Sequence, residues 1–235
     1  GGLLITKGNS IDVYIKGDIV GTNSASRTID FDIDKVTDVY FVGQLYGYGV
    51  APSGTYTPWY TGYVTTLQGG TVTTISKANT GKAAAQNVAV NVSNQPMGGF
   101  ITNFTGEAVS VTAMTFTIGT SSLTASGDAL FTNVSIVDEN GTVVAGPVDA
   151  THHATAGQTL SFADTVTFPT GAHTYYLQGK ISSLVTGGSY TVSTTPSSGW
   201  TNPTGQSTGN TVSLSAQSTA ITSNTMTVKA GALKV

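Results

Sequence analysis

The stretch Gly171-Ala-His-Thr-Tyr-Tyr-Leu-Gln-Gly-Lys-Ile181 organises this chain of 235 residues, because a related stretch lies near the other end. Gly8-Asn-Ser-Ile-Asp-Val-Tyr-Ile-Lys-Gly-Asp-Ile19 has the same build, with a glycine, an aromatic and aliphatic strand, and then Gly, a charged residue and Ile. Residues 14–19 align with residues 176–181 at an offset of 162, and Trp59 aligns with Trp200 at an offset of 141. Internal repeats define an architecture before any single element does. The sequence therefore predicts two related β-units, of which the first carries an insertion.

The composition favours exposed β-sheet and excludes several classes of protein. Charged residues make up 9% of the chain, the net charge is −3, and the mean hydropathy is +0.09. Disordered chains combine low hydrophobicity with high net charge, and nucleic-acid-binding proteins need a basic surface, so neither class fits. The chain has no cysteine and therefore no disulfide or thiolate metal site. Because no apolar run approaches eighteen residues, we expect no membrane span.

The hydrophobic pattern predicts an all-β fold. Residues 27–36 alternate strictly between apolar and acidic side chains, which is typical of a half-buried strand. We expect strands at residues 3–7 and 11–19, a helical turn within residues 77–85, and a break at Pro96-Met-Gly-Gly99. Residues 131–148 read as a hairpin around Asn140-Gly141, a strong turn signal. Strands spaced eight to fourteen residues apart predict immunoglobulin-like β-sandwiches.

The repeat divides the chain into three parts. We expect a partial β-sandwich with an aromatic loop insert over residues 1–70, a complete sandwich over 71–220 and a terminal strand over 221–235. An unpaired strand can complete the sheet of another subunit, and such head-to-tail contacts build filaments. The alternatives are a piece of a longer tandem array and pairing within one chain. The candidate donor residues, for which the partner would be a copy of the same chain, are Thr225, Met226, Val228, Leu233 and Val235.

One strand face carries three carboxylates and is the candidate metal site. Asp30, Asp32 and Asp34 alternate with apolar residues, and calcium prefers such oxygen ligands. Carboxylates two residues apart on a strand lie about 7 Å apart, so a second segment would have to contribute ligands. The competing interpretation is a solvated edge whose charges discourage aggregation.

The densest group of aromatic residues is the candidate ligand or interface surface. Exposed aromatic side chains on a loop stack on sugars or anchor protein interfaces, whereas buried ones form a small core. The recurrence of Trp59 as Trp200 favours packing. The group consists of Tyr46, Tyr48, Tyr56, Trp59 and Tyr60.

Four Asn-x-Ser/Thr sequences are candidate glycosylation sites in a secreted protein. In a chain this rich in Asn, Ser and Thr, several such sequences arise by chance. They begin at Asn91, Asn103, Asn133 and Asn140.

The catalytic signals are weak, and we expect no enzyme. The histidines are poorly placed to activate a serine nucleophile, and Glu107 and Glu139 are the only glutamates. A buried Glu107 beside Lys77 or Lys82 and an asparagine would be the arrangement of a self-formed Lys–Asn isopeptide bond.

The sequence Phe131-Thr-Asn-Val-Ser-Ile-Val-Asp-Glu-Asn-Gly-Thr-Val-Val-Ala-Gly-Pro147, together with Pro169-Thr-Gly171 and the strand that follows, resembles the tandem immunoglobulin-like modules of prokaryotic surface proteins. That family includes surface-layer proteins and adhesins. The resemblance implies an extracellular structural building block at a cell surface, assembling with copies of itself. The alternatives are a carbohydrate-binding or adhesion module that uses the Tyr/Trp loop on a surface glycan, and a viral or phage surface protein.

Overall fold

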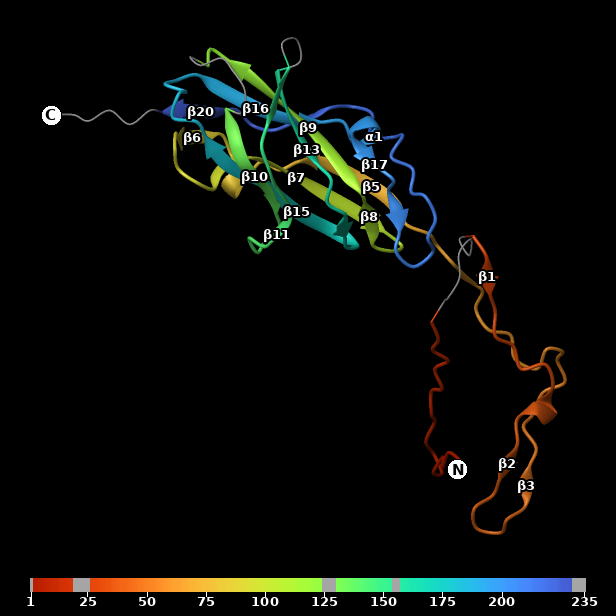
Figure 1. The fold of residues 1–235 in the computed structure, drawn as a ribbon. Coiled ribbons are helices and arrows are strands. Elements are labelled where there is room, and N and C mark those ends of the chain that lie inside the picture. Colours follow the sequence, from red (N-terminus) through yellow and green to blue (C-terminus); the bar gives the residue numbers. More distant parts are fainter. Residues whose placement is uncertain (1, 19–25, 124–129, 154–156, 230–235) are drawn as a thin grey trace.

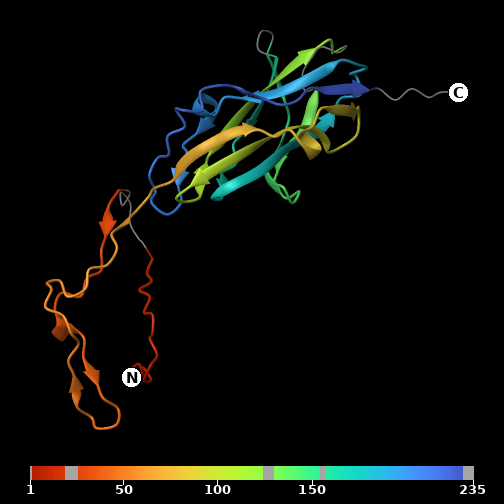
Figure 2. The same ribbon diagram turned by 180° about the vertical axis from the view of Figure 1, so that it is seen from behind.

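The protein is all-β, as the hydrophobic pattern predicts. The structure is a computed structural model and describes residues 2–18, 26–123, 130–153 and 157–229. Most of its strands lie in a β-sandwich between residues 71 and 229, and the preceding residues extend away from one end of that sandwich (Figure 1). Seen from behind, the same separation is clear (Figure 2).

One face of the sandwich is a five-stranded antiparallel sheet. Its long central strand β15 pairs with β10 on one side and with β7 on the other, and the strand order is β11-β10-β15-β7-β5. The edge strands are β11 and β5. The five strands are β5 (Thr71–Lys77), β7 (Gln95–Thr105), β10 (Phe131–Val137), β11 (Val143–Val148) and β15 (Gly171–Ile181).

The opposite face is a sheet in the order β12-β13-β9-β16-β20-β6, with β17 and β19 attached to β9 and β16. All its pairings are antiparallel except that of β20 with β6, which is parallel. The strands are β6 (Gln86–Ala89), β9 (Ala113–Ser121), β12 (Thr151–His153), β13 (Gly157–Phe162), β16 (Ser189–Thr194), β17 (Trp200–Thr201), β19 (Ile221–Thr222) and β20 (Met226–Lys229).

A small third sheet lies at the end of the sandwich nearest residue 70. The strand-forming residues 109–121 are divided at Thr112, so that the first part joins this sheet as β8 and the second part is β9 of the large sheet. The sheet contains β14 (Val166–Phe168), β8 (Val109–Val111) and β18 (Thr204–Gly205). Two short turns lie elsewhere: η2 (Gly81–Ala83) packs on β7, and α1 (Pro196–Gly199) packs on β9 and β17.

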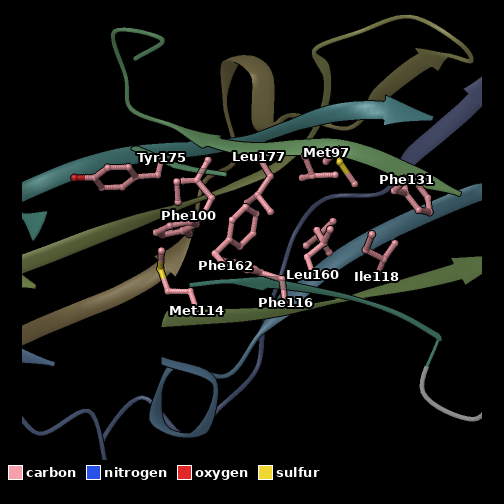
Figure 3. Close-up of a cluster of buried hydrophobic side chains, with 14 of the residues drawn as sticks. Met97, Phe100, Met114, Phe116, Ile118, Phe131, Leu160, Phe162, Tyr175 and Leu177 are labelled. Atoms are coloured by element: carbon pink, nitrogen blue, oxygen red, sulfur yellow. The ribbon is translucent and has the colours of Figure 1, made fainter. Parts of the chain in front are cut away.

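The core lies between the two large sheets and is rich in aromatic rings (Figure 3). Phe100 packs against the rings of Phe116, Phe168, Tyr175 and Trp200, with centroids 5.4–6.4 Å apart. Alternating strand positions supply these side chains, because successive residues of a strand face opposite sides of the sheet. Burial of this apolar surface is the main force that stabilises the sandwich.

The predicted hairpin at Asn140-Gly141 is confirmed. Strands β10 and β11 pair in antiparallel register, and Gly141 has a φ of +86°. The Asp138 carboxylate accepts hydrogen bonds from the backbone N–H groups of Asn140 and Thr142, at 2.9 and 2.8 Å. A glycine at positive φ and an aspartate that caps the turn explain why the chain reverses here.

The predicted break at Pro96-Met-Gly-Gly99 is wrong, because these residues lie within β7. The glycines serve close packing. A Cβ on Gly98 would lie 2.5 Å from Ser223 Cβ, and one on Gly99 would lie 2.6 Å from the Tyr175 carbonyl oxygen. Glycine thus permits neighbouring segments to approach within the sandwich.

Residues 26–70 form two short ladders instead of a sheet with a core. Strand β1 (Thr28–Ile29) pairs with β4 (Thr65–Thr66), and β2 (Phe41–Val42) pairs with β3 (Gly49–Val50). A 3₁₀ turn, η1 (Val36–Asp38), and a bridge between Ile33 and Tyr60 lie between these ladders. The expected strand over residues 27–36 is therefore reduced to two residues and one bridge.

The predicted strands at residues 3–7 and 11–19 are not formed within the described residues 2–18. A strand needs a neighbour for its backbone hydrogen bonds, and no described strand pairs with these residues. The side chains of residues 2–18 are all exposed. The pattern that predicts strands is present here, but the partner strands are not.

The predicted boundary at residue 220 needs correction. Two strands that follow this boundary pair with β16 inside the sandwich. Strand β19 (Ile221–Thr222) pairs with one part of β16, and β20 pairs with Ser189–Tyr190. Met226 and Val228 are fully buried in its core. The sandwich therefore extends from residue 71 to residue 229, and its last described strand is not left over for another subunit.

Candidate functional site

The candidate site is the region before the sandwich together with its junction, because exposed apolar side chains gather there. Among residues 2–18, every large aliphatic or aromatic side chain is exposed. These side chains belong to Leu3, Leu4, Ile5, Ile11, Val13, Tyr14 and Ile15. Exposed apolar surface of this extent marks an interaction surface more often than an idle one.

The described residues of the repeat adopt opposite environments in the two copies. In β15, Tyr175, Leu177 and Ile181 are buried, whereas Val13 and Ile15 at matching positions are 72% and 67% exposed. The final isoleucine of the first copy, Ile19, lies outside the described residues. The same motif is thus a central strand in one place and an unpaired segment in the other.

The aromatic residues predicted as a ligand or interface surface lie along the excursion from residue 40 to residue 63. Tyr46 and Tyr48 lie in the turn of the β2–β3 hairpin and are about three-quarters exposed, as is Tyr56. Tyr60 is half exposed and bridges Ile33. These rings are not a small core under a loop. They are accessible for stacking on a partner.

Trp59 and Trp200 differ in what surrounds them. Trp200 is buried against Phe100 and Phe168, and its indole N–H donates to Thr194 Oγ1 over 3.1 Å. Trp59 is half-buried and its indole N–H donates to the Ser53 carbonyl oxygen over 3.2 Å. Trp200 therefore packs in the core of the sandwich, whereas Trp59 contacts only its own loop.

Glu107 forms the junction between the sandwich and the segment that precedes it. One carboxylate oxygen accepts hydrogen bonds from the Gly70 N–H, at 2.8 Å, and from the Thr208 hydroxyl, at 2.5 Å. The other oxygen accepts from the N–H groups of Ser207 and Thr208, at 2.5 and 2.8 Å. Both oxygens are thus fully used in holding the first strand to the loop over residues 207–208.

Burial by itself would raise the pKa of Glu107, but hydrogen bonds from Thr208, Gly70 and Ser207 lower it below its ordinary value of 4.5. Two glycines make room for this arrangement. A Cβ on Gly205 would collide with the Glu107 carboxylate, and one on Gly106 would collide with the Gly69 carbonyl oxygen. The sequence singles out Glu107 as buried, but nothing in its local pattern identifies the loop that binds it.

The arrangement required for an isopeptide bond is not assembled around Glu107. Lys77 donates to Asn224 Oδ1 over 3.2 Å, so a lysine and an asparagine do meet. The hydrogen-bond partners of Glu107 are instead Gly70, Ser207 and Thr208. Lys77 and Asn224 therefore pair without the glutamate.

The three carboxylates predicted to bind calcium are exposed. Asp32 accepts a hydrogen bond from the Gly62 N–H over 3.1 Å, a contact between two segments that are far apart in the sequence. In the described ranges, no group of three or more His, Asp or Glu side chains is placed to hold a metal ion. Asp30, Asp32 and Asp34 thus line one exposed segment without converging on a point with other acidic groups.

The four candidate glycosylation asparagines lie in different settings. Asn91 and Asn133 are exposed at positive φ, and Asn140 is exposed in the β10–β11 turn. Asn103 is half-buried within β7, between β5 and β15. Of the four, Asn103 is the least accessible.

The predicted donor residues are placed in the sandwich as far as they are described. Met226 and Val228 face the core, and Thr225 precedes β20 on the surface. Leu233 and Val235 lie outside the described residues. Within the chain, β6 and β16 flank β20, so Met226 and Val228 already complete the sandwich of their own chain.

No protein family, curated protein or solved structure compared with the chain matches it. Within the described residues, no helix is long and apolar enough to cross a membrane.

Proposed function

We propose that the chain is a non-enzymatic structural building block of an extracellular assembly, a surface layer or filament, that joins copies of itself through β-strand contacts. The observation that carries the proposal is the contrast between a fully packed sandwich and a preceding segment of strand-forming sequence with exposed apolar residues. Unpaired strands with apolar side chains are templates for other strands.

The edges of the sandwich support the choice of the preceding segment as the assembly surface. Edge strand β11 contains Pro147, which has no N–H to donate. In edge strand β5, the Ile75 N–H donates a hydrogen bond to the Gln217 side-chain oxygen over 3.1 Å. These features discourage pairing at two edges, whereas residues 11–18 contain no proline.

The junction at Glu107 also favours a structural role. Gly70 is held by a carboxylate that simultaneously holds Ser207 and Thr208, so the entering segment is fixed at the end of the sandwich. An ordered assembly requires a constant orientation between neighbouring subunits. A fixed connection between the sandwich and the preceding segment would keep that orientation constant.

Electron microscopy and sedimentation of the full chain test the proposal. We expect filaments, sheets or concentration-dependent oligomers, and their loss in the double variant Val13→Asp, Ile15→Asp. Leu184→Asp is the matched control, since Leu184 is 70% exposed on the sandwich itself. Single particles at all concentrations, or equal loss of assembly in the control, would contradict the proposal.

A second candidate function is glycan binding by the exposed tyrosines, favoured by the accessibility of Tyr46 and Tyr48 on the β2–β3 hairpin. Aromatic rings bind sugar faces by stacking. Titration with soluble cell-wall polysaccharide would test it, with Trp59→Ala and the pair Tyr46→Ala, Tyr48→Ala expected to abolish binding. Unchanged binding in both variants would rule out this surface.

A further inference from the structure

The strand motif shared by residues 14–18 and 176–180 identifies what could cover the exposed segment. In β15, the inward positions are Tyr175, Leu177, Gly179 and Ile181, all buried. At the same offset, Tyr175, Leu177 and Gly179 correspond to Val13, Ile15 and Gly17. The alternation of the first segment therefore matches the inward face of a central strand.

The neighbours of β15 show what such a strand requires. On one side it pairs with β10, with Ile136 opposite Leu177, and on the other it pairs with β7, with Phe100 opposite Tyr175. Both neighbours run antiparallel to it, and both contribute apolar side chains to the core. Residues 11–18 have a matching inward pattern, and no described strand pairs with them on either side.

Gly17 provides an independent observation. At Gly179, a Cβ would lie 2.8 Å from Val134 Cγ2 of β10 and 3.1 Å from Met97 Sδ of β7, so a side chain would collide with both flanking strands. At Gly17, a Cβ would meet nothing within 4 Å, and this glycine has no positive φ that would favour it. A side chain is excluded at position 179 and meets no atom at position 17, so the glycine at position 17 matches what a position between two such strands requires.

We propose that residues 11–18 form the central strand of a second β-sandwich, whose other strands are a polypeptide segment of the β7 and β10 type. This partner would present two antiparallel strands with apolar inward faces, one on each side of the segment. It would close over Val13 and Ile15 and approach Gly17 from both sides. The proposal rests on the proposed function in taking strand contact as the mode of assembly.

The partner is not the chain's own sandwich, because β15 already occupies the place between β7 and β10. It is not the terminal strand either, because β20 is a single strand already paired with β6 and β16. The backbone groups on both edges of residues 11–18 therefore require another pair of strands. Each strand of this pair would have the residue pattern of β7 or β10.

The test adds a copy of residues 71–170 ahead of Gly1 in the full chain, which supplies strands of the required type. Hydrogen exchange of residues 11–18 is compared in the original and the extended chain. We expect exchange to slow about a hundredfold or more in the extended chain, since amides in a central strand open only by unfolding. Val13→Tyr restores the residue found in β15 and should slow exchange further. Gly17→Val should abolish the protection.

Unprotected residues 11–18 in both the extended chain and its Val13→Tyr variant would overturn the proposal. Protection that survives Gly17→Val would also overturn it. The experiment is separate from the assembly test, because assembly through another surface would leave residues 11–18 exchanging freely.

Discussion

The sandwich over residues 71–229 and the region over residues 1–70 contain the same strand motif in opposite circumstances. Leu177 in β15 is buried between two neighbouring strands, and Ile15 at the matching position is exposed. The difference lies in the neighbours and not in the motif, because a β-strand depends on side chains and hydrogen bonds from other strands. A sequence can therefore encode a strand completely and still leave it unformed.

The two regions differ in the same way in their aromatic residues. The rings of Phe100, Phe168 and Trp200 pack on one another in the sandwich, whereas Tyr46 and Tyr48 project from a hairpin. The first group stabilises the fold, and the second is available for a partner. Substitutions placed in each region should separate these two roles.

The largest contrast is expected between Phe100→Ala and Phe31→Ala. Phe100 is buried among four aromatic rings, so its truncation should lower the free energy of unfolding by about 3–5 kcal/mol. Phe31 is 56% exposed, and its truncation should change that free energy by less than about 0.5 kcal/mol. Chemical denaturation measures both. Equal effects would show that the region before residue 71 shares the core.

Met226→Ala tests whether the last described strand belongs to the sandwich. The side chain is fully buried, so its truncation should cost about 2–5 kcal/mol of unfolding free energy. Thr225→Ala, at an exposed neighbour, is the control and should have little effect. A stable Met226→Ala variant that has lost only assembly would restore the donor-strand interpretation.

Glu107→Gln tests the junction between the two regions. The amide N–H₂ of glutamine would face N–H donors, and the lost charge-assisted hydrogen bonds should cost about 1.5–3 kcal/mol. Glu139→Gln, which removes only the contact of that exposed glutamate with His173, is the control.

The same carboxylate gives the junction a pH dependence. The pKa of Glu107 is lower in the folded protein than its ordinary value of 4.5, so its contribution is fully present above that value and is lost as the pH falls through the folded-state pKa. Thermal denaturation between pH 6 and about pH 3 should therefore show a steeper loss of stability for the original chain than for Glu107→Gln. Parallel curves would exclude this role of Glu107.

The smallest effect on stability is expected from Ile15→Ser. Ile15 contacts no core, so the free energy of unfolding of the sandwich should change by less than about 0.5 kcal/mol. Self-association measured by sedimentation should nevertheless weaken. A large loss of stability would show that residues 11–18 pack on the sandwich in solution.

Much of the sandwich could be predicted from the sequence because its signals are local. The Asn140-Gly141 turn and the alternation of β9, β10 and β15 depend on neighbours in the chain. The continuation of β7 through Pro96-Met-Gly-Gly99 could not be predicted. Those glycines are required by close contacts with Ser223 and Tyr175, which are distant in sequence. The position of Met226 in the core depends equally on pairing with β6, about 140 residues earlier.

The candidate site could be predicted only in part. The repeat identifies residues 14–19 as strand-forming, and composition identifies the tyrosine cluster. The exposure of these residues could not be predicted, because it depends on which strands are beside them. The partners of Glu107 likewise lie about 100 residues further along the chain, and no local pattern connects them.

Hydrogen exchange of the unextended full chain at low concentration distinguishes the packed strands from the unpartnered segment. We expect slow exchange across β7, β9, β15 and Met226–Lys229, and exchange near the rate of an unfolded peptide across residues 2–18. Fast exchange of Met226–Lys229 together with slow exchange of residues 11–18 would contradict this expectation, because the packed and the unpartnered strands would then have been assigned the wrong way round.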